Sequence, residues 1–418
     1  WMPVGSPSST AREEQSSPLI ENTAIDPDDG KTTYGGLPLK DPEAADRGEF
    51  SSSLQYILTC IGYAVGLGNI WRFPAVAYRN GGGAFLLPYM VIGLLFGLPL
   101  LFMEVTIGQF TQSGPSMAFL YYMPLLQGLG WTMSIISITI AVYYNVVVAW
   151  ALLYMINIAF GMSSRWALCD NEWNNELCDT SHVCTLPEVF FNGSCVSADA
   201  RHDLLKDRSG DAEMQTATDQ FFTFHVLNKH LDFAPGRFQW QIAAALSTCW
   251  LLTFLGLVFG VRWLGRITLV TATLPYVIIT MLFVRGVTLE GAYDGIAWFL
   301  VNPDFSKALE LATWKNALTQ MAFSLSIGLG GMLAMASYNK RSHNAYKDAV
   351  IIVAADSCMS VFGGVAVFST LGFMMNRLKM DIEEIVPSPL SLAFVVYPEA
   401  ISHMALPWLW SFLFFFML

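Results

Sequence analysis

Long apolar runs recur along this chain, and they constrain its fold more than any other feature. A helix needs about 20 predominantly apolar residues to cross a hydrocarbon core about 30 Å thick. Because 54% of the 418 residues are hydrophobic and only 13% are charged, we expect the bilayer to be the solvent. The sequence therefore predicts an all-α polytopic membrane protein. The expected spans are residues 54–78, 85–107, 132–160, 240–260, 268–284, 315–338, 348–371 and 406–418.

Both ends of the chain indicate a fragment. It starts at Trp1 without a methionine, and its last apolar run stops at Leu418 at about half the length that a span requires. Residues 1–49 are polar, acidic and rich in Ser, Pro and Asp, which predicts a disordered tail without a signal peptide. The net charge of −11 comes partly from this tail, and no basic face indicates nucleic-acid binding.

Cysteine usage gives the clearest topological signal. Four of the seven cysteines lie in the one long loop, residues 161–238, beside a glycosylation sequon at Asn192. These are Cys169, Cys178, Cys184 and Cys195. Both features favour an extracellular loop, with chance clustering of reduced cysteines as the alternative. Counting spans back from an extracellular loop places the N-terminal tail in the cytoplasm.

Two of the expected spans contain clusters of helix-breaking residues. The first span has the stretch 62–74, GYAVGLGNIWRFP, and the sixth has the stretch 324–331, SLSIGLGG. Interrupted segments at matching positions of two halves are typical of the binding site of transporters with inverted repeats. Irregular backbone at membrane depth is tolerated only where it is buried or lines a cavity. The alternative is that these glycines only allow close helix packing.

Polar groups inside the spans narrow the function further. Glu104 and Asp356 are acids within apolar runs, where a lone charge is costly and usually functional. No metal-ligand spacing or nucleophile motif is present, and the glycines at 81–83 lack the Lys-Ser/Thr of a phosphate-binding loop. Enzyme chemistry therefore has no candidate residues.

The stretch 62–74, followed by NGGGAFLLPY at 80–89, resembles the neurotransmitter:sodium symporter family. The resemblance covers residues from about 47 to 418. It implies a bacterial leucine-transporter-like fold with twelve spans, in which spans 1–5 and 6–10 form inverted five-helix repeats with broken first and sixth helices. This chain would be truncated within the eighth span. Residues 50–418 would form the transporter domain, in the plasma membrane.

The resemblance also implies a substrate site at the two breaks. The backbone amides of Leu67 and Gly68 would bind the substrate carboxylate, assisted by the Tyr144 hydroxyl. Monoamine carriers that resemble this pattern have Asp at position 66, so Gly66 favours an amino acid. The side-chain pocket would be lined by Ile140, Val147, Phe323, Ser326 and Leu329. Packing against lipid or core is the alternative for Phe323, the expected outer cap, and for the aliphatic residues.

Two ion sites and an anion site are implied in the same way. The first cation site would use the Ala64 carbonyl, the Asn69 and Ser324 side chains, and Asp356. The second would begin with the carbonyls of Gly62 and Val65, and its eighth-span ligands lie beyond Leu418. Oxygen ligands suit a hard cation such as Na⁺. The chloride site would consist of Tyr89, Gln320, Ser324 and Ser360.

Asp356 departs from the family, which usually has asparagine at this position. Ionised, it would bind the cation more strongly and repel chloride from Ser360, one helical turn away. Protonated, it would mimic asparagine and change little. Some insect nutrient amino-acid carriers look similar here and accept K⁺ as well as Na⁺. Our hypothesis is the ionised form, with broader cation selectivity and weaker chloride dependence.

The resemblance supplies gates and a disulfide as well. Arg72 would be the outer-gate arginine and Arg47 the inner one, although snorkelling to lipid headgroups is an alternative for Arg47. Phe50 replaces the usual tryptophan near it. Cys169 and Cys178 are spaced like the disulfide of animal members, whereas a second bridge, Cys184 to Cys195, is not supplied by the resemblance.

Our leading hypothesis is cation-coupled, chloride-assisted uptake of a neutral amino acid by alternating access. The expected partners are this small-molecule substrate and membrane lipid. An ion channel or receptor without coupled transport is one alternative, but a seven-helix receptor would not need paired breaks. A transport-inactive family member that acts in trafficking is another, and the intact Leu67, Gly68 and Tyr144 count against it.

Overall fold

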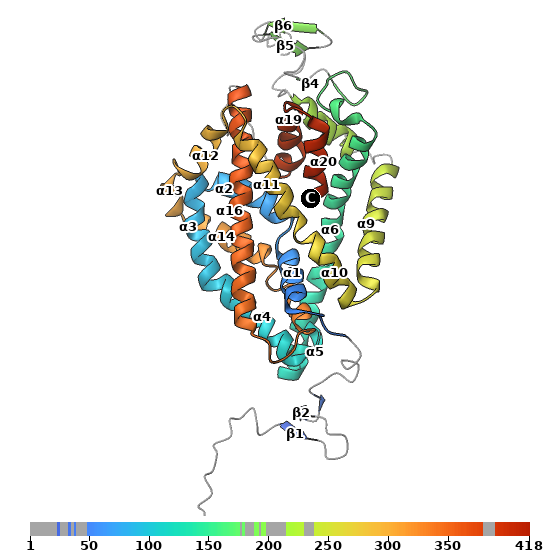
Figure 1. Ribbon diagram of the computed structural model, residues 1–418, viewed down its shortest axis with the longest axis vertical. Helices are drawn as coiled ribbons and strands as arrows, with labels where there is room; N and C mark the ends of the chain where they lie inside the picture. The colour runs from blue at the N-terminus through green and yellow to red at the C-terminus, as the bar shows by residue number, and fades with distance from the viewer. Residues whose placement is uncertain are drawn as a thin grey trace, which may run out of the picture.

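The computed structural model describes residues 23–25, 32–34, 37–38, 48–175, 178–179, 188–191, 194–197, 215–229, 238–378 and 389–418. Helices that stand side by side make up most of the described chain (Figure 1). Within these ranges, five helical segments are long and apolar enough to cross a membrane: Gly82–Thr111, Pro124–Ala159, Trp240–Val258, Val261–Val287 and Ala345–Asn376. The chain is therefore a multi-pass helical membrane protein, as its sequence predicts.

The first expected span is broken near its middle. Helix α1 (Ser53–Ala64) is capped by the Ser52 side chain and ends where Val65 turns extended, with φ −86° and ψ 101°. A π-helix, η2 (Gly68–Arg72), and then helix α2 (Phe73–Arg79) continue the span. Between α1 and η2 the Gly66 amide donates to Oδ1 of Asn69 at 3.1 Å instead of to a helical carbonyl.

The sixth expected span is broken as well. Helix α14 (Leu311–Ser324) and helix α15 (Gly331–Ala336) are separated by six residues without helical structure. Gly328 and Gly330 adopt left-handed backbone conformations, with φ 81° and 75°. Ser326 also has a positive φ of 54°, a conformation that is strained for a residue with a side chain. The glycine-rich sequence therefore produces a real turn rather than a closely packed helix.

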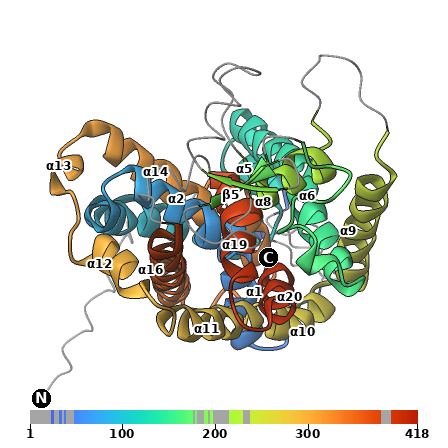
Figure 2. The ribbon, with the colours of Figure 1, turned by 90° about the horizontal axis from the view of Figure 1, so that it is seen from above.

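The remaining helices form the rest of the bundle. Before the long loop they are η3 (Gly82–Phe85), α3 (Leu86–Ile92), η4 (Gly93–Gly97), α4 (Leu98–Thr111), α5 (Pro115–Tyr122), η5 (Pro124–Leu126) and α6 (Gln127–Ala159). After it they are α9 (Trp240–Val258), α10 (Val261–Thr271), α11 (Leu274–Val287), α12 (Ala292–Leu300), α13 (Phe305–Ala308), α16 (Ala345–Leu378), α18 (Pro389–Ser391), η8 (Leu392–Val396), α19 (Tyr397–Ser402) and α20 (Pro407–Met417). Seen from above, α9 and α13 lie at opposite edges of the bundle (Figure 2).

The long loop carries short elements at one end of the bundle. They are η6 (Met162–Ser164), β4 (Cys178–Asp179), β5 (Glu188–Phe191), β6 (Ser194–Ser197), β7 (Gln215–Thr216), α8 (Ala217–Gln220) and η7 (Phe221–Val226). Strands β5 and β6 pair antiparallel, and β4 pairs with β7 in parallel. Cys169 and Cys178 form a disulfide, as the resemblance implies. Cys195 is also disulfide-bonded, while Cys184 and the sequon residue Asn192 lie outside the described residues.

Part of the tail has structure that the sequence did not predict. Strands β1 (Thr23–Ile25), β2 (Thr32–Tyr34) and β3 (Leu37–Pro38) pair antiparallel, because threonine, isoleucine and tyrosine favour extended backbone. The expected disorder of the rest of the tail, and the inner-gate candidate Arg47, lie outside the described residues.

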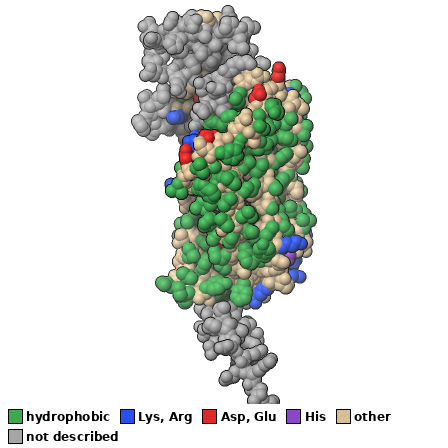
Figure 3. All heavy atoms as spheres, turned by 90° about the vertical axis from the view of Figure 1, so that its left-hand side faces the viewer, with side chains coloured by type: hydrophobic (Ala, Val, Ile, Leu, Met, Phe, Trp, Pro, Cys, Tyr) green, Lys and Arg blue, Asp and Glu red, His purple; other side chains and the backbone are tan. Residues whose placement is uncertain are grey.

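The two ends of the bundle differ in their charged side chains. The β5–β6 pair lies at the end opposite to β1 and β2 (Figure 1). On the face shown in Figure 3, hydrophobic side chains cover the helices, Lys and Arg gather at the lower edge, and Asp and Glu occur near the upper edge together with further Lys and Arg. A broad apolar band between polar ends suits a protein that the bilayer surrounds.

Candidate transport site

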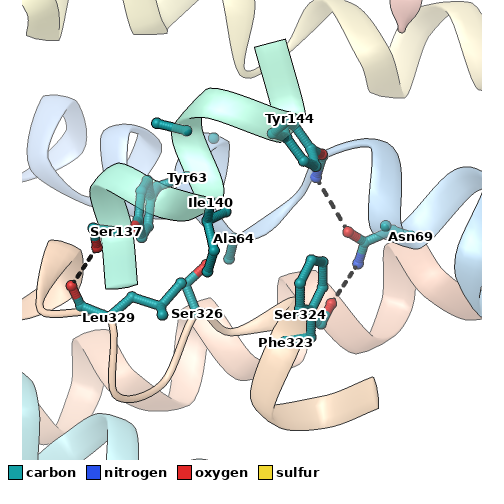
Figure 4. Close-up of a pocket in the computed structure, with 14 residues that line it drawn as sticks. Tyr63, Ala64, Asn69, Ser137, Ile140, Tyr144, Phe323, Ser324, Ser326 and Leu329 are labelled. Atoms are coloured by element: carbon teal, nitrogen blue, oxygen red, sulfur yellow. Dashed lines mark hydrogen bonds between the residues drawn. The ribbon is translucent and has the colours of Figure 1, made fainter. Parts of the chain in front are cut away.

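The two breaks and α6 together enclose a cavity of about 440 Å³ (Figure 4). The first broken span contributes Gly62, Tyr63, Ala64, Gly66, Gly68 and Asn69 to its wall. Helix α6 contributes Ser137, Ile140, Ala141 and Tyr144. The second broken span contributes Phe323, Ser324, Ser326 and Leu329. The wall thus combines irregular backbone with a few polar side chains, as small-molecule sites usually do.

The break in the first span lies against the Tyr144 hydroxyl. A Cβ added to Gly66 would lie 3.6 Å from this hydroxyl, so only a residue without a long side chain leaves the space open. The backbone of Leu67 hydrogen-bonds the same hydroxyl. Leu67 itself is buried and does not line the cavity, which means that its amide, not its side chain, faces Tyr144. Two hydrogen-bonding groups therefore meet at one end of the cavity.

Phe323 closes another side of the cavity. The Arg72 guanidinium lies 4.3 Å from the centre of the Phe323 ring, in a cation–π geometry. The same ring would be 3.9 Å from a Cβ on Gly68. One nitrogen of Arg72, Nη1, is buried without a hydrogen-bond partner among the described residues. An aromatic cover with a cation above it therefore spans the cavity on the α2 side.

The break in the second span is held in place by two neighbours. The Ser137 hydroxyl donates to the Leu329 carbonyl at 2.6 Å. The Gly328 amide donates to Oε1 of Glu104, also at 2.6 Å. Glu104 is the unexplained acid of the second span, and its partner is a backbone amide that the break frees from helical bonding. Its other oxygen, Oε2, is buried without a partner in the described chain.

Beside the cavity, five polar side chains from four elements form one buried hydrogen-bond network. Asn69 Nδ2 donates to Asp356 Oδ1 at 2.7 Å, to Ser360 Oγ at 2.9 Å and to Ser324 Oγ at 3.1 Å. The Tyr89 hydroxyl is 3.3 Å from Ser360 Oγ. The candidate side-chain ligands of the first cation site are therefore joined in a single cluster with Tyr89 and Ser360 of the candidate chloride site.

Asp356 lies at the centre of this network. Its side chain is fully buried, with an exposed fraction of 0%. Oδ1 accepts hydrogen bonds from Asn69 at 2.7 Å and from Ser324 at 2.8 Å, and Oδ2 accepts one from Tyr89 at 3.4 Å. An acceptor-only carboxylate can accept all of these bonds, from the Asn69 amide and from the two hydroxyls.

The other residues that the sequence predicted for the ion sites and the substrate pocket lie outside this hydrogen-bond network. Gln320 is buried, its Nε2 donates to the Gly68 carbonyl at 3.5 Å, and its Oε1 has no partner among the described residues. Val65 belongs to the hydrophobic core. Val147 packs against the same core rather than lining the cavity, because α6 runs past the cavity beyond Tyr144.

Sequence reasoning missed several residues of the wall. Ser137 and Ala141 lie on the same face of α6 as Ile140 and Tyr144, and the helical spacing of three or four residues would have identified them. Tyr63 lies within the glycine-rich stretch, where no signal distinguishes it from its neighbours. For Glu104, the sequence indicated a function but not a partner.

Comparisons with known proteins identify the family of the chain. Residues 47–418 match the model of the sodium:neurotransmitter symporter family. The chain is 40% identical to the sodium-dependent transporter snf-5 of Caenorhabditis elegans, over 90% of this chain and 53% of that protein. It is 37% identical to the sodium- and chloride-dependent glycine transporter 2 of Xenopus laevis, over 96% of this chain and 52% of that protein. It is 38% identical to the sodium- and chloride-dependent creatine transporter 1 of Bos taurus, over 98% of this chain and 63% of that protein. The chain thus spans about half to two-thirds of the length of these relatives.

Proposed function

Because the chain belongs to the sodium:neurotransmitter symporter family, we propose that it takes up a neutral amino acid together with Na⁺ and Cl⁻ by alternating access. The observation that carries this proposal is the cavity of about 440 Å³ between two broken spans, with Gly66 beside Tyr144. The glycine and creatine transporters among its relatives are named as sodium- and chloride-dependent, which supports the choice of ions. The protein would lie in the plasma membrane, with the tail in the cytoplasm and the long loop outside.

In this proposal the substrate carboxylate binds at Gly66, Leu67 and Gly68. Backbone amides at the start of η2 and the Tyr144 hydroxyl are suitable donors for an anion. The hydrogen bond between Leu67 and Tyr144 would open to admit the carboxylate between them. Phe323 would cover the bound substrate, and Arg72 above it would act as the outer gate.

The side chain of the substrate would lie toward Ile140, Ser326 and Leu329. All three residues line the cavity, away from Asn69. The cavity leaves room for a small or medium side chain, because Phe323 and Tyr144 already occupy its other sides. A neutral side chain is favoured, since no ionisable carboxyl or ammonium group occurs among the described wall residues.

The first Na⁺ would be held by oxygen atoms of the Ala64 carbonyl, Asn69, Ser324 and Asp356. The Asn69, Ser324 and Asp356 side chains already contact one another, with Asn69 turned so that Nδ2 faces the other two and Oδ1 accepts from the Gly66 amide. A bound cation would replace these hydrogen bonds with shared coordination and would require the Asn69 amide to turn its oxygen toward the site. The Gly62 and Val65 carbonyls would begin the second Na⁺ site. The inverted-repeat arrangement of the family would place both sites at the centre of the membrane.

Chloride would bind to the donors Tyr89, Gln320, Ser324 and Ser360. Asp356 already accepts hydrogen bonds from two of them, so its charge would compete with the anion. We therefore propose weak chloride dependence and a cation site that accepts K⁺ as well as Na⁺. The protonated alternative would leave the site equivalent to that of an asparagine-bearing relative.

Uptake of radiolabelled substrates by cells expressing the protein tests this function. We expect saturable uptake of one or more neutral amino acids that requires an inward Na⁺ or K⁺ gradient. Monoamines should not be carried, because Gly66 offers no carboxylate to pair with an amine. Surface-expressed protein that carries no neutral amino acid under any cation gradient would refute the proposal.

A further inference from the structure

A groove of about 350 Å³ lies at the end of the bundle opposite to the long loop. It runs between the last turns of α4, the connection that follows α15, and the first turn of α16. We call it the α4–α16 groove and define it by Phe102, Gln109, Phe110, Arg341 and Tyr346. None of the residues that line it belongs to the wall of the transport cavity.

Hydrogen bonds from two glutamine side chains, one in α4 and one at its C-cap, hold one wall of this groove in place. Gln109 Nε2 donates to the carbonyls of Arg341 at 3.1 Å and His343 at 2.6 Å. Gln112 Nε2 donates to the Asn339 carbonyl at 2.6 Å. These three bonds hold the connection 339–343 against α4, so its side chains are presented from a fixed backbone. A pre-formed wall reduces the ordering that a ligand must impose on binding.

The groove combines a cation with aromatic surface. The Arg341 guanidinium lies 5.8 Å from the centre of the Phe110 ring, and Phe102 meets Tyr346 edge to face at 5.6 Å. Phe110 and Tyr346 are more than half exposed, at 56% and 57%. No acidic side chain occurs among the described residues that line the groove. The groove is therefore positively charged and amphipathic.

The position of the groove along the bundle determines which kind of molecule can reach it. The apolar segment Gly82–Thr111 ends at the groove and the apolar segment Ala345–Asn376 begins there, so the groove lies where hydrocarbon gives way to water. Asp348, the nearest acid on α16, faces His343 at 2.9 Å and is not part of the lining. Lys and Arg side chains gather at the corresponding edge of the hydrophobic face (Figure 3). A molecule bound here has one apolar part and one negatively charged part.

We propose that the α4–α16 groove binds an anionic phospholipid, whose phosphate is held by Arg341. A guanidinium suits phosphate because its planar N–H groups form two parallel hydrogen bonds with two oxygens. Phe110 and Tyr346 provide the amphipathic ring surface that lies at the level of lipid headgroups. The acyl chains then extend along the exposed apolar side of α4 past Phe102.

Native mass spectrometry of the purified protein in detergent tests this site, with phosphatidylglycerol and phosphatidylcholine as probes. We expect phosphatidylglycerol to bind more tightly than phosphatidylcholine. Arg341→Ala should weaken phosphatidylglycerol binding by about fivefold, the effect of one basic residue at an anionic surface. Arg262→Ala is the matched control, since Arg262 is an exposed arginine in the first turn of α10. It removes the same charge and should leave binding unchanged.

Further arms distinguish lipid binding in the groove from a general effect of charge and from binding of a soluble phosphate. Phe110→Ala should weaken phosphatidylglycerol binding while leaving the charge of the protein intact. Equal binding by wild type and Arg341→Ala would overturn the proposal. So would an equal loss in Arg262→Ala, which would reduce the effect to net charge. Full displacement of the lipid by an equal concentration of glycerol phosphate would identify a soluble phosphate compound as the ligand instead, and would also overturn it.

Discussion

Asp356→Asn isolates the charge at the centre of the polar network. The substitution keeps the size of the side chain and one acceptor oxygen, so the hydrogen bonds from Asn69 and Ser324 can persist. It removes the negative charge and replaces one carboxylate oxygen with a donor. Any change in ion dependence therefore reports the charge of Asp356 rather than a change of packing.

The geometry sets the expected size of the effect. Asp356 Oδ2 is 3.4 Å from the Tyr89 hydroxyl, which is itself a candidate chloride donor. At a separation of about 5 Å and an effective dielectric constant of about 20, a carboxylate and a chloride ion repel by about 3 kcal/mol. A cation bound between them cancels part of this repulsion. We therefore expect Asp356→Asn to strengthen apparent chloride affinity by at least about tenfold, which corresponds to about 1.4 kcal/mol.

Radiolabelled uptake measures both consequences. Initial rates would be compared in Na⁺, K⁺ and Li⁺, each with chloride and with gluconate in its place. Wild type should retain much of its uptake in gluconate and should accept K⁺. Asp356→Asn should require chloride and should favour Na⁺ more strongly, because the site has lost a fixed charge. Asp294→Asn, which removes an exposed acid on α12, is the control and should match wild type.

One result would refute this reasoning. If properly delivered wild type and Asp356→Asn show identical cation and chloride profiles, Asp356 acts as a neutral substitute for asparagine. The carboxyl group would then be protonated in the transport cycle, and its hydrogen bonds alone would matter.

The remaining predictions concern single sites. Gly66→Asp should abolish amino-acid uptake, because the new carboxylate repels the substrate carboxylate. Gly66→Ala should retain uptake, because its Cβ fits at 3.6 Å from the Tyr144 hydroxyl. Normal uptake by both variants would show that the substrate carboxylate does not bind beside Gly66. Tyr144→Phe should raise the substrate concentration for half-maximal uptake by roughly tenfold or more, since one charge-assisted hydrogen bond contributes about 1.5–3 kcal/mol. Ser360→Ala should weaken activation by chloride, and an unchanged chloride response would remove this hydroxyl from the anion site. Cys169→Ala and Cys178→Ala should each lower the amount of protein at the cell surface by biotinylation, because loss of a disulfide usually costs about 2–5 kcal/mol; normal surface levels in both would show that the bond is dispensable.

The amino-acid sequence by itself determined the membrane environment, the approximate spans and the two breaks. These properties are local: a run of apolar residues matches the thickness of the bilayer, and glycines at 328 and 330 allow left-handed backbone that ends a helix. In the tail, the polar and acidic composition predicted disorder, whereas three short neighbouring strands pair there.

Only the tertiary structure decided which polar groups meet. Asn69 contacts Ser324 and Asp356 across 255 and 287 positions of the chain, and no local pattern specifies such a pairing. The rotation of each helix about its axis then determined which side chains line the cavity. It placed Ser137 on the cavity wall and Val147 against the core, and it gave Glu104 the Gly328 amide as its partner. Helix rotation follows from the packing of all neighbouring helices together, so the sequence of one span cannot fix it alone.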